Sequence, residues 1–112
     1  MTTESAAPLS FEVEESVDEK NWKRTTITCH GRLVSDTAAP LKDLVKPLIE
    51  QGGHIVIDCG DIAHVDSSGL GVLVALKVSA IHQTACTLEL VHLSDRVLEL
   101  LRLTHLNRLF SV

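Results

Sequence analysis

Residues that could do chemistry gather in one segment, Asp66-Ser67-Ser68-Gly69-Leu70-Gly71. The segment lies between a strand-like stretch at residues 54–59 and a long apolar run, so it predicts the loop and first turn of a helix. A Ser there can cap the helix, because its side chain accepts a hydrogen bond from an N–H group of the first turn. Alternatively, Ser67 is a phosphate acceptor, because a helix N-terminus stabilises a dianion through its dipole and free N–H groups. The local chemistry leaves both interpretations open.

Other catalytic and metal-binding patterns are missing from the sequence. It has neither a G-x-x-x-x-G-K phosphate loop nor a glycine-rich kinase loop with its lysine. The six histidines include no pair at i, i+3 or i, i+4, and the three cysteines form no C-x-x-C motif. We therefore expect no enzymatic activity, no metal and no cofactor. We expect buried thiols in a reducing compartment at Cys29, Cys59 and Cys86.

Length and charge narrow the class of protein further. The 112 residues are enough for one domain with its own core, and 45% of them are hydrophobic, with a mean hydropathy of +0.20. A formal charge of −5 argues against nucleic-acid binding, which needs a clustered basic face. We find no signal peptide pattern, and no apolar run approaches the roughly 20 residues of a membrane span. We expect a cytoplasmic protein that binds other proteins and neither nucleic acid nor the membrane interior.

The first half of the chain predicts a hairpin and a helix. Residues 11–17 and 25–33 are strand-like and flank a turn, whereas residues 1–9 are expected to form a flexible tail. A helix should begin near Ser35, Asp36 or Thr37, because apolar residues recur with helical spacing from 41 to 49. Pro47 lies within that pattern, so we expect a kink or an early end near Lys46.

The second half of the chain alternates between strands and helices. Ile55-Val56-Ile57 is typical of a central strand covered on both faces. The run at 70–81 is apolar nearly all round, so its helix is either packed mainly by its own domain or partly used by a partner. A strand at 87–93, a helix from Ser94 and a short final strand at 109–112 complete the pattern. This order predicts an α/β fold: residues 10–112 form a mainly parallel sheet of four to five strands, with an antiparallel N-terminal hairpin and three main helices.

The chain resembles the STAS domain of anti-sigma factor antagonists from about Thr25 to Phe110. The resemblance depends on Gly31-Arg32-Leu33 followed by Thr37-Ala38, on an apolar strand ending in Asp58, and above all on Val65 with the segment 66–71. The chain departs from the family at Val34, where the family often carries Asp.

This resemblance implies a phosphorylation-controlled switch. The unphosphorylated protein would bind an anti-sigma factor serine kinase and release the sigma factor, phosphate on Ser67 would block binding, and a serine phosphatase would restore it. The docking surface implied around Ser67 contains six residues: Asp66, Ser68, Gly69, Leu70, Ser35 and Asp36.

Two other functions remain open. A STAS domain can also be a structural partner that is not phosphorylated, such as an accessory subunit of a lipid or anion transporter or of a signalling complex. A small hydrolase with Ser67 as nucleophile would need a base within hydrogen-bond reach, and His64 is the only candidate nearby.

Overall fold

Four strands form one mixed sheet in the computed structural model, which describes residues 9–112. They lie in chain order: β1 (Ser10–Val17), β2 (Lys23–Leu33), β3 (Gly53–Val65) and β4 (Cys86–Val91). β1 pairs antiparallel with β2, whereas β3 runs parallel to both β2 and β4. The expected hairpin and mainly parallel sheet are thus confirmed. Of the expected tail, residues 1–8 lie outside the described residues, and Leu9 is buried against the core.

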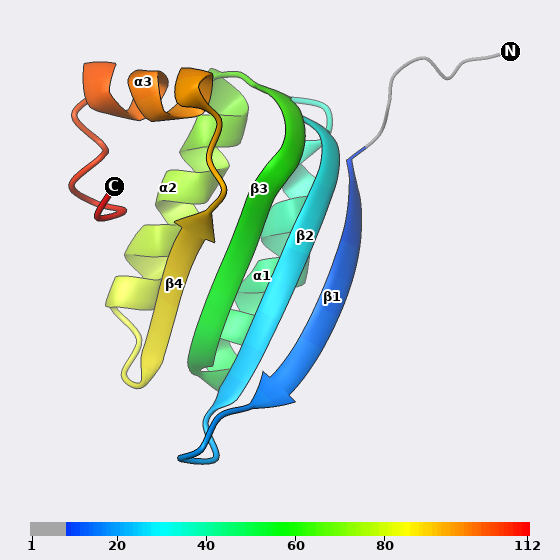
Figure 1. Ribbon diagram of the computed structural model, residues 1–112, viewed down its shortest axis with the longest axis vertical. Coiled ribbons are helices and arrows are strands. Elements are labelled where there is room, and N and C mark those ends of the chain that lie inside the picture. Colours follow the sequence, from blue (N-terminus) through cyan, green and yellow to red (C-terminus); the bar gives the residue numbers. More distant parts are fainter. Residues whose placement is uncertain (1–8) are drawn as a thin grey trace, which may run out of the picture.

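Three helices complete the fold of residues 9–112. α1 (Ala38–Gln51) and α2 (Ser67–Ile81) lie side by side on one face of the sheet, and α3 (Asp95–Leu103) lies at the sheet end where β3 finishes (Figure 1). The aliphatic spacing that predicted α1 buries Leu41, Val45 and Ile49. The core between helices and sheet also contains Ile27 and Ile57, which are fully buried on the two central strands.

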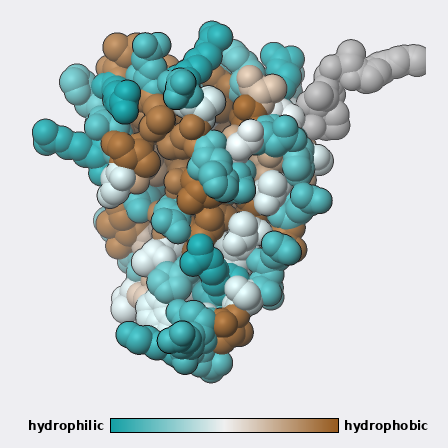
Figure 2. All heavy atoms as spheres, in the orientation of Figure 1, coloured by the Kyte–Doolittle hydropathy of each residue, from teal (hydrophilic) through white to brown (hydrophobic). Residues whose placement is uncertain are grey.

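The opposite face of the sheet, which we call the open face, carries no helix (Figure 1). It presents mostly polar side chains, among them Thr28, His30 and Asp58, which alternate with the core residues of their strands. Figure 2 shows that hydrophobic residues on this side gather towards α3 and the C-terminal segment, whereas the hairpin end is mostly hydrophilic. Ile55, Val56 and Ile57 of β3 are nevertheless all buried, so the expectation of a central strand covered on both faces is confirmed, although no helix covers the open face. Val56 is only 3% exposed because its own strand neighbours flank it.

Three further expectations need correction. α1 continues through Pro47 to Gln51, so it has no early end at Lys46. Residues 109–112 form no strand: 109–111 lie in turns, although Phe110 is buried. Cys29 and Cys59 are buried, and burial raises the pKa of each thiol to about 12, but Cys86 is only half-buried. None of the helices described here has the length and apolar character needed to cross a membrane.

Candidate functional site

Asp66 organises the segment between β3 and α2. One carboxylate oxygen, Oδ1, accepts a hydrogen bond from Gly69 N–H at 2.9 Å, and the other, Oδ2, accepts one from Ser35 N–H at 3.2 Å. The backbone of Asp66 is extended, with φ −103° and ψ −174°, as is usual for a residue directly before a helix. Asp66 is therefore the N-cap of α2, and it also joins the loops that follow β2 and β3.

This cap rules out one of the two interpretations of Ser67. Ser67 is the first residue of α2 and is exposed, so the capping position is already filled by the residue before it. Within residues 9–112 its hydroxyl makes no hydrogen bond to protein. The interpretation of Ser67 as the cap was wrong, and its side chain is free at the positive end of the helix dipole. Ser68 is exposed beside it.

Gly69 and Leu70, which we expected in the docking surface, are buried beneath it. A Cβ atom added at Gly69 would lie 2.1 Å from the carbonyl oxygen of Leu33, so only glycine lets the first turn of α2 approach the end of β2 this closely. Leu70 belongs to the hydrophobic core. Gly69 and Leu70 therefore lie beneath the exposed Ser67 and Ser68 and offer a partner little surface of their own.

The loop between β2 and α1 lies beside this segment, as expected, because parallel strands β2 and β3 end together at the pair Leu33 and Val65. Ser35 reaches Asp66 through its backbone N–H, and Asp36 is exposed in the same loop. Thr37 is the N-cap residue of α1, but its hydroxyl makes no capping bond. Thr37 Oγ1 instead accepts a hydrogen bond from Val34 N–H at 2.9 Å, which holds the loop folded.

Backbone N–H groups also fix the charge of the site. The bond from Gly69 N–H, followed by those from Ser35 and Ser68, keeps the pKa of the Asp66 carboxyl below its usual range. His64 adds a smaller attraction of the same sign. Asp66 is consequently a carboxylate at neutral pH, and it lies next to the exposed Ser67.

The structure offers little support for catalysis by Ser67. Among the described residues no hydrogen bond joins Ser67 to His64, which is half-buried, so the contact between nucleophile and base is missing. Residues 9–112 also contain no group of three or more His, Cys, Asp or Glu side chains that could hold a metal ion.

An apolar stripe extends from Ser67 along the outer side of α2. Its members recur three or four residues apart and therefore share one face of the helix: Gly71, Val74, Val78 and Ile81. Val78 is 40% exposed and Ile81 59%, whereas Leu73 and Leu76 on the inner side are buried. Packing by the domain itself is thus confirmed for the inner side of α2. On the outer side Val74 is half-buried against the core, whereas Val78 and Ile81 are uncovered.

The fold and this segment define a STAS domain. Residues 16–111 match the family model described as "Mlab, STAS domain", and the chain belongs to this family. It is 30% identical over 98 residues to the anti-sigma-B factor antagonist of Bacillus subtilis strain 168, an alignment that covers 87% of this chain and 89% of that protein. The chain is therefore a member of the anti-sigma factor antagonist family of STAS domains.

Solved structures show the same fold. An anti-sigma factor antagonist from Mycobacterium paratuberculosis superposes with a TM-score of 0.72, at 18% identity, over 90% of this chain and 83% of that one. The Bacillus cell fate determinant SpoIIAA, in its phosphorylated form, superposes with a TM-score of 0.66, at 19% identity, over 88% of this chain and 86% of that one. At these identities the likeness establishes the architecture alone.

Proposed function

We propose that this chain is a phosphorylation-controlled antagonist of an anti-sigma factor. Its unphosphorylated form binds an anti-sigma factor serine kinase and thereby releases the sigma factor. Phosphate on Ser67 blocks that binding, and a serine phosphatase restores it. The chain acts in the cytoplasm as the substrate and ligand of these enzymes and is not itself a catalyst.

The observation that carries this proposal is that Asp66 caps α2 while the neighbouring Ser67 is exposed. Because Asp66 caps α2, the hydroxyl of Ser67 has no structural task and is exposed at the helix N-terminus. Phosphorylation brings about −1.5 to −2 charges, and the N-terminus of a helix attracts negative charge through its dipole. Repulsion from the Asp66 carboxylate opposes this attraction. Because the attraction by the helix dipole and the repulsion by Asp66 largely cancel, we expect phosphate on Ser67 to leave the fold almost unchanged.

Docking responds differently to the same charge. A partner surface that fits a neutral Ser67 would have to desolvate the phosphate or repel it, which costs several kcal/mol. The apolar stripe of α2 begins one turn after Ser67, on the same side of the helix, and would lie against the same partner, because Val78 and Ile81 are exposed there. The hydrophobic contact between this stripe and the partner has the Ser67 hydroxyl at one end, so the charge of a phosphate there can by itself switch binding off.

The relatives support this assignment. The Bacillus subtilis relative is named an anti-sigma-B factor antagonist, and SpoIIAA has been solved with phosphate attached. The alternative, a STAS subunit that is not phosphorylated, would use the same outer side of α2 without modification. Phosphate transfer distinguishes the two functions.

The test is to incubate the chain with ATP and the candidate anti-sigma factor kinase and to map the product by mass spectrometry. We expect one phosphate, on Ser67, and none on Ser67→Ala. Ser79→Ala is the matched control, because Ser79 is an exposed serine far from the cap on the same helix and its loss should not affect labelling. A Ser67→Ala protein that still gains one phosphate, mapped to Ser68, would overturn the assignment. No labelling of the wild type would favour the unphosphorylated subunit.

A further inference from the structure

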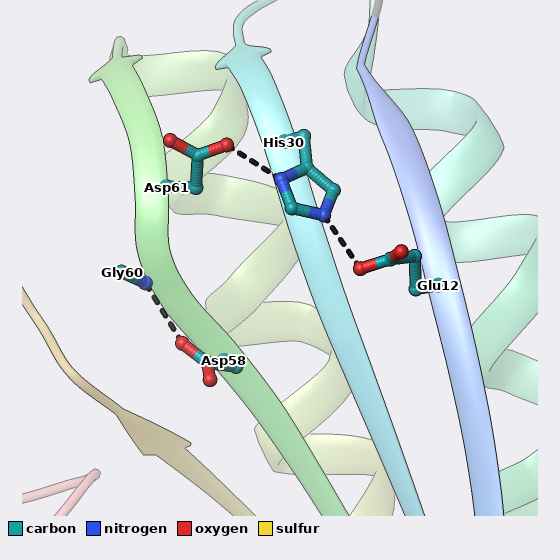
Figure 3. Close-up of polar contacts among 5 residues, drawn as sticks. All are labelled: Glu12, His30, Asp58, Gly60 and Asp61. Atoms are coloured by element: carbon teal, nitrogen blue, oxygen red, sulfur yellow. Dashed lines mark hydrogen bonds and ion pairs between the residues drawn. The ribbon is translucent and has the colours of Figure 1, made fainter.

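The imidazole of His30 lies between two carboxylates on the open face of the sheet. Its Nδ1 is 2.5 Å from Asp61 Oδ2, and its Nε2 is 2.9 Å from Glu12 Oε1 (Figure 3). Glu12 comes from β1, His30 from β2 and Asp61 from β3, so one ring connects three strands. The proposed phosphorylation site does not use any of these residues.

An irregularity in β3 builds this arrangement. Thr28 lies opposite Asp58, so a regular register would place His30 opposite Gly60, but His30 lies opposite Asp61. β3 therefore contains one extra residue at this point, a β-bulge. The bond from Gly60 N–H to Asp58 Oδ1, at 2.9 Å, lies within the bulge (Figure 3). The bulge thus turns a carboxylate towards His30 where the regular register would have placed a glycine.

The two neighbouring carboxylates determine the protonation state of the His30 ring. An ionised carboxylate can only accept hydrogen bonds, whereas a neutral imidazole has one N–H donor and one acceptor nitrogen. Both contacts of His30 can be hydrogen bonds only if both ring nitrogens carry protons. The hydrogen bond to Asp61, and then the one to Glu12, raises the pKa of His30 above its ordinary value.

We propose that doubly protonated His30 is a pH-dependent clasp that fastens the edge strand β1 to the rest of the sheet. β1 needs such a contact, because seven of its eight residues are exposed, and Val13 and Val17 are 45% and 59% exposed. When the ring loses a proton, it can donate to only one carboxylate. Asp61 holds the closer position on a central strand, so Glu12 is released. β1 then keeps its backbone pairing with β2, the ion pair between Glu15 and Lys23 at 3.2 Å, and the packing of Phe11 against the core.

Other charges around the ring favour the same outcome. On β3, Asp58 also faces the open side, and it pairs with His92, which follows β4, at 3.0 Å. On its own strand the charged neighbour of His30 is Arg32, whose side chain forms no ion pair within residues 9–112. Loss of the His30 charge leaves the carboxylates of Glu12, Asp58 and Asp61 on one surface with less positive charge among them. Their mutual repulsion adds to the loss of the bond to Glu12.

The sign of the pH dependence is therefore fixed. Since the pKa of His30 is raised in the folded state, its contribution to stability is fully present below the ordinary His pKa. This contribution is lost as the pH rises through the raised value. β1 should be held most firmly in mildly acidic solution and less firmly above neutral pH.

The experiment combines an NMR titration of the His30 ring with hydrogen exchange of the β1 amides, expressed as protection factors so that the intrinsic pH dependence of exchange is removed. Between about pH 6 and about pH 8, where histidines titrate, protection of residues 10–17 should fall several-fold in the wild type and stay level in His30→Gln. His82→Gln is the control, because His82 is an exposed histidine at the end of α2 that makes no ion pair in the described part of the chain.

A second pair of variants keeps the proposal testable if His30→Gln fails to fold. Glu12→Gln should lower the pKa of His30, whereas Glu14→Gln, two residues further along β1, should change it much less. A ring that titrates at or below the ordinary His value in the wild type would overturn the clasp. Protection of β1 with the same pH dependence in wild type and His30→Gln would overturn it as well.

Discussion

Gly69 and Leu33 lie so close that a Cβ atom on the glycine would be 2.1 Å from the carbonyl oxygen of the leucine. This approach seats the first turn of α2 on the end of β2. Asp66 strengthens the same junction, since its backbone N–H donates to Leu33 O at 3.3 Å while its side chain caps the helix. The contacts of Asp66 and Gly69 with the end of β2 thus fix the backbone around Ser67 and leave its side chain exposed.

Gly69→Ala should therefore destabilise the protein, by about 1–3 kcal/mol, as overpacked sites commonly do. Gly71→Ala is the matched control, because nothing lies within 4 Å of a Cβ added at that helical glycine. The control should be neutral or more stable by up to about 1 kcal/mol, because alanine favours the helix. Denaturant unfolding measures both, and equal stabilities of the two variants would contradict the proposed role of the contact with Leu33.

Truncation to alanine on the inner side of α2 should lower stability, whereas truncation on the outer side should weaken binding. Leu73→Ala should cost about 2–5 kcal/mol of unfolding free energy, because its side chain is buried in the core. Val78→Ala should cost less than about 0.5 kcal/mol, as surface changes usually do, yet it should weaken binding of the kinase. Thermal unfolding and calorimetric titration separate the two effects. A Val78→Ala protein with unchanged kinase affinity would remove the outer stripe from the docking surface.

Pro47 offers a chance to stabilise the protein. Proline has no N–H to donate to Asp43 O, and the helix continues past it, so Pro47→Ala should restore one backbone hydrogen bond and raise the unfolding free energy by about 1–3 kcal/mol. Pro40 is the control, because it is also exposed but lies in the first turn, where N–H groups have no helical partner. Replacement of Pro40 by Ala should change stability far less.

Acid should weaken the cap of α2. Because the pKa of Asp66 is lowered in the folded state, its carboxylate contributes stability above the ordinary Asp pKa, and this contribution is lost as the pH falls through the lowered value. Asp66→Asn keeps an acceptor for Gly69 N–H but cannot titrate, so its Tm should fall less steeply in acid than that of the wild type. Asp36→Asn, at an exposed position in the neighbouring loop, should retain the steep wild-type fall.

Much of this fold was predictable because its signals are local. Helical spacing of aliphatic residues marked α1, and alternating strand and helix patterns marked the parallel sheet. The cap of α2 was less predictable. Asp66, Ser67 and Ser68 are all common capping residues, and only the end of β3 determines which of them takes the extended backbone conformation.

The remaining errors have a common physical cause, which is that tertiary packing outweighed local preference. α1 continues through Pro47 because Val45 and Ile49, on either side of the proline, are buried in the core. The contact of His30 with Asp61, for which the sequence analysis made no prediction, depends on a bulge that shifts the pairing of β2 with β3 between Thr28 and His30. Such features become visible only once the strands are aligned.

The most direct test of the proposed switch is the affinity of the anti-sigma factor kinase for unmodified and Ser67-phosphorylated protein, measured by calorimetric titration. Both forms should show the same circular dichroism. We expect phosphate to weaken binding by about 100-fold or more, since tenfold corresponds to only about 1.4 kcal/mol. Ser67→Ala should bind like the unmodified form, and Ser67→Glu should bind poorly. Equal affinity of the kinase for the phosphorylated and unmodified forms would contradict the account.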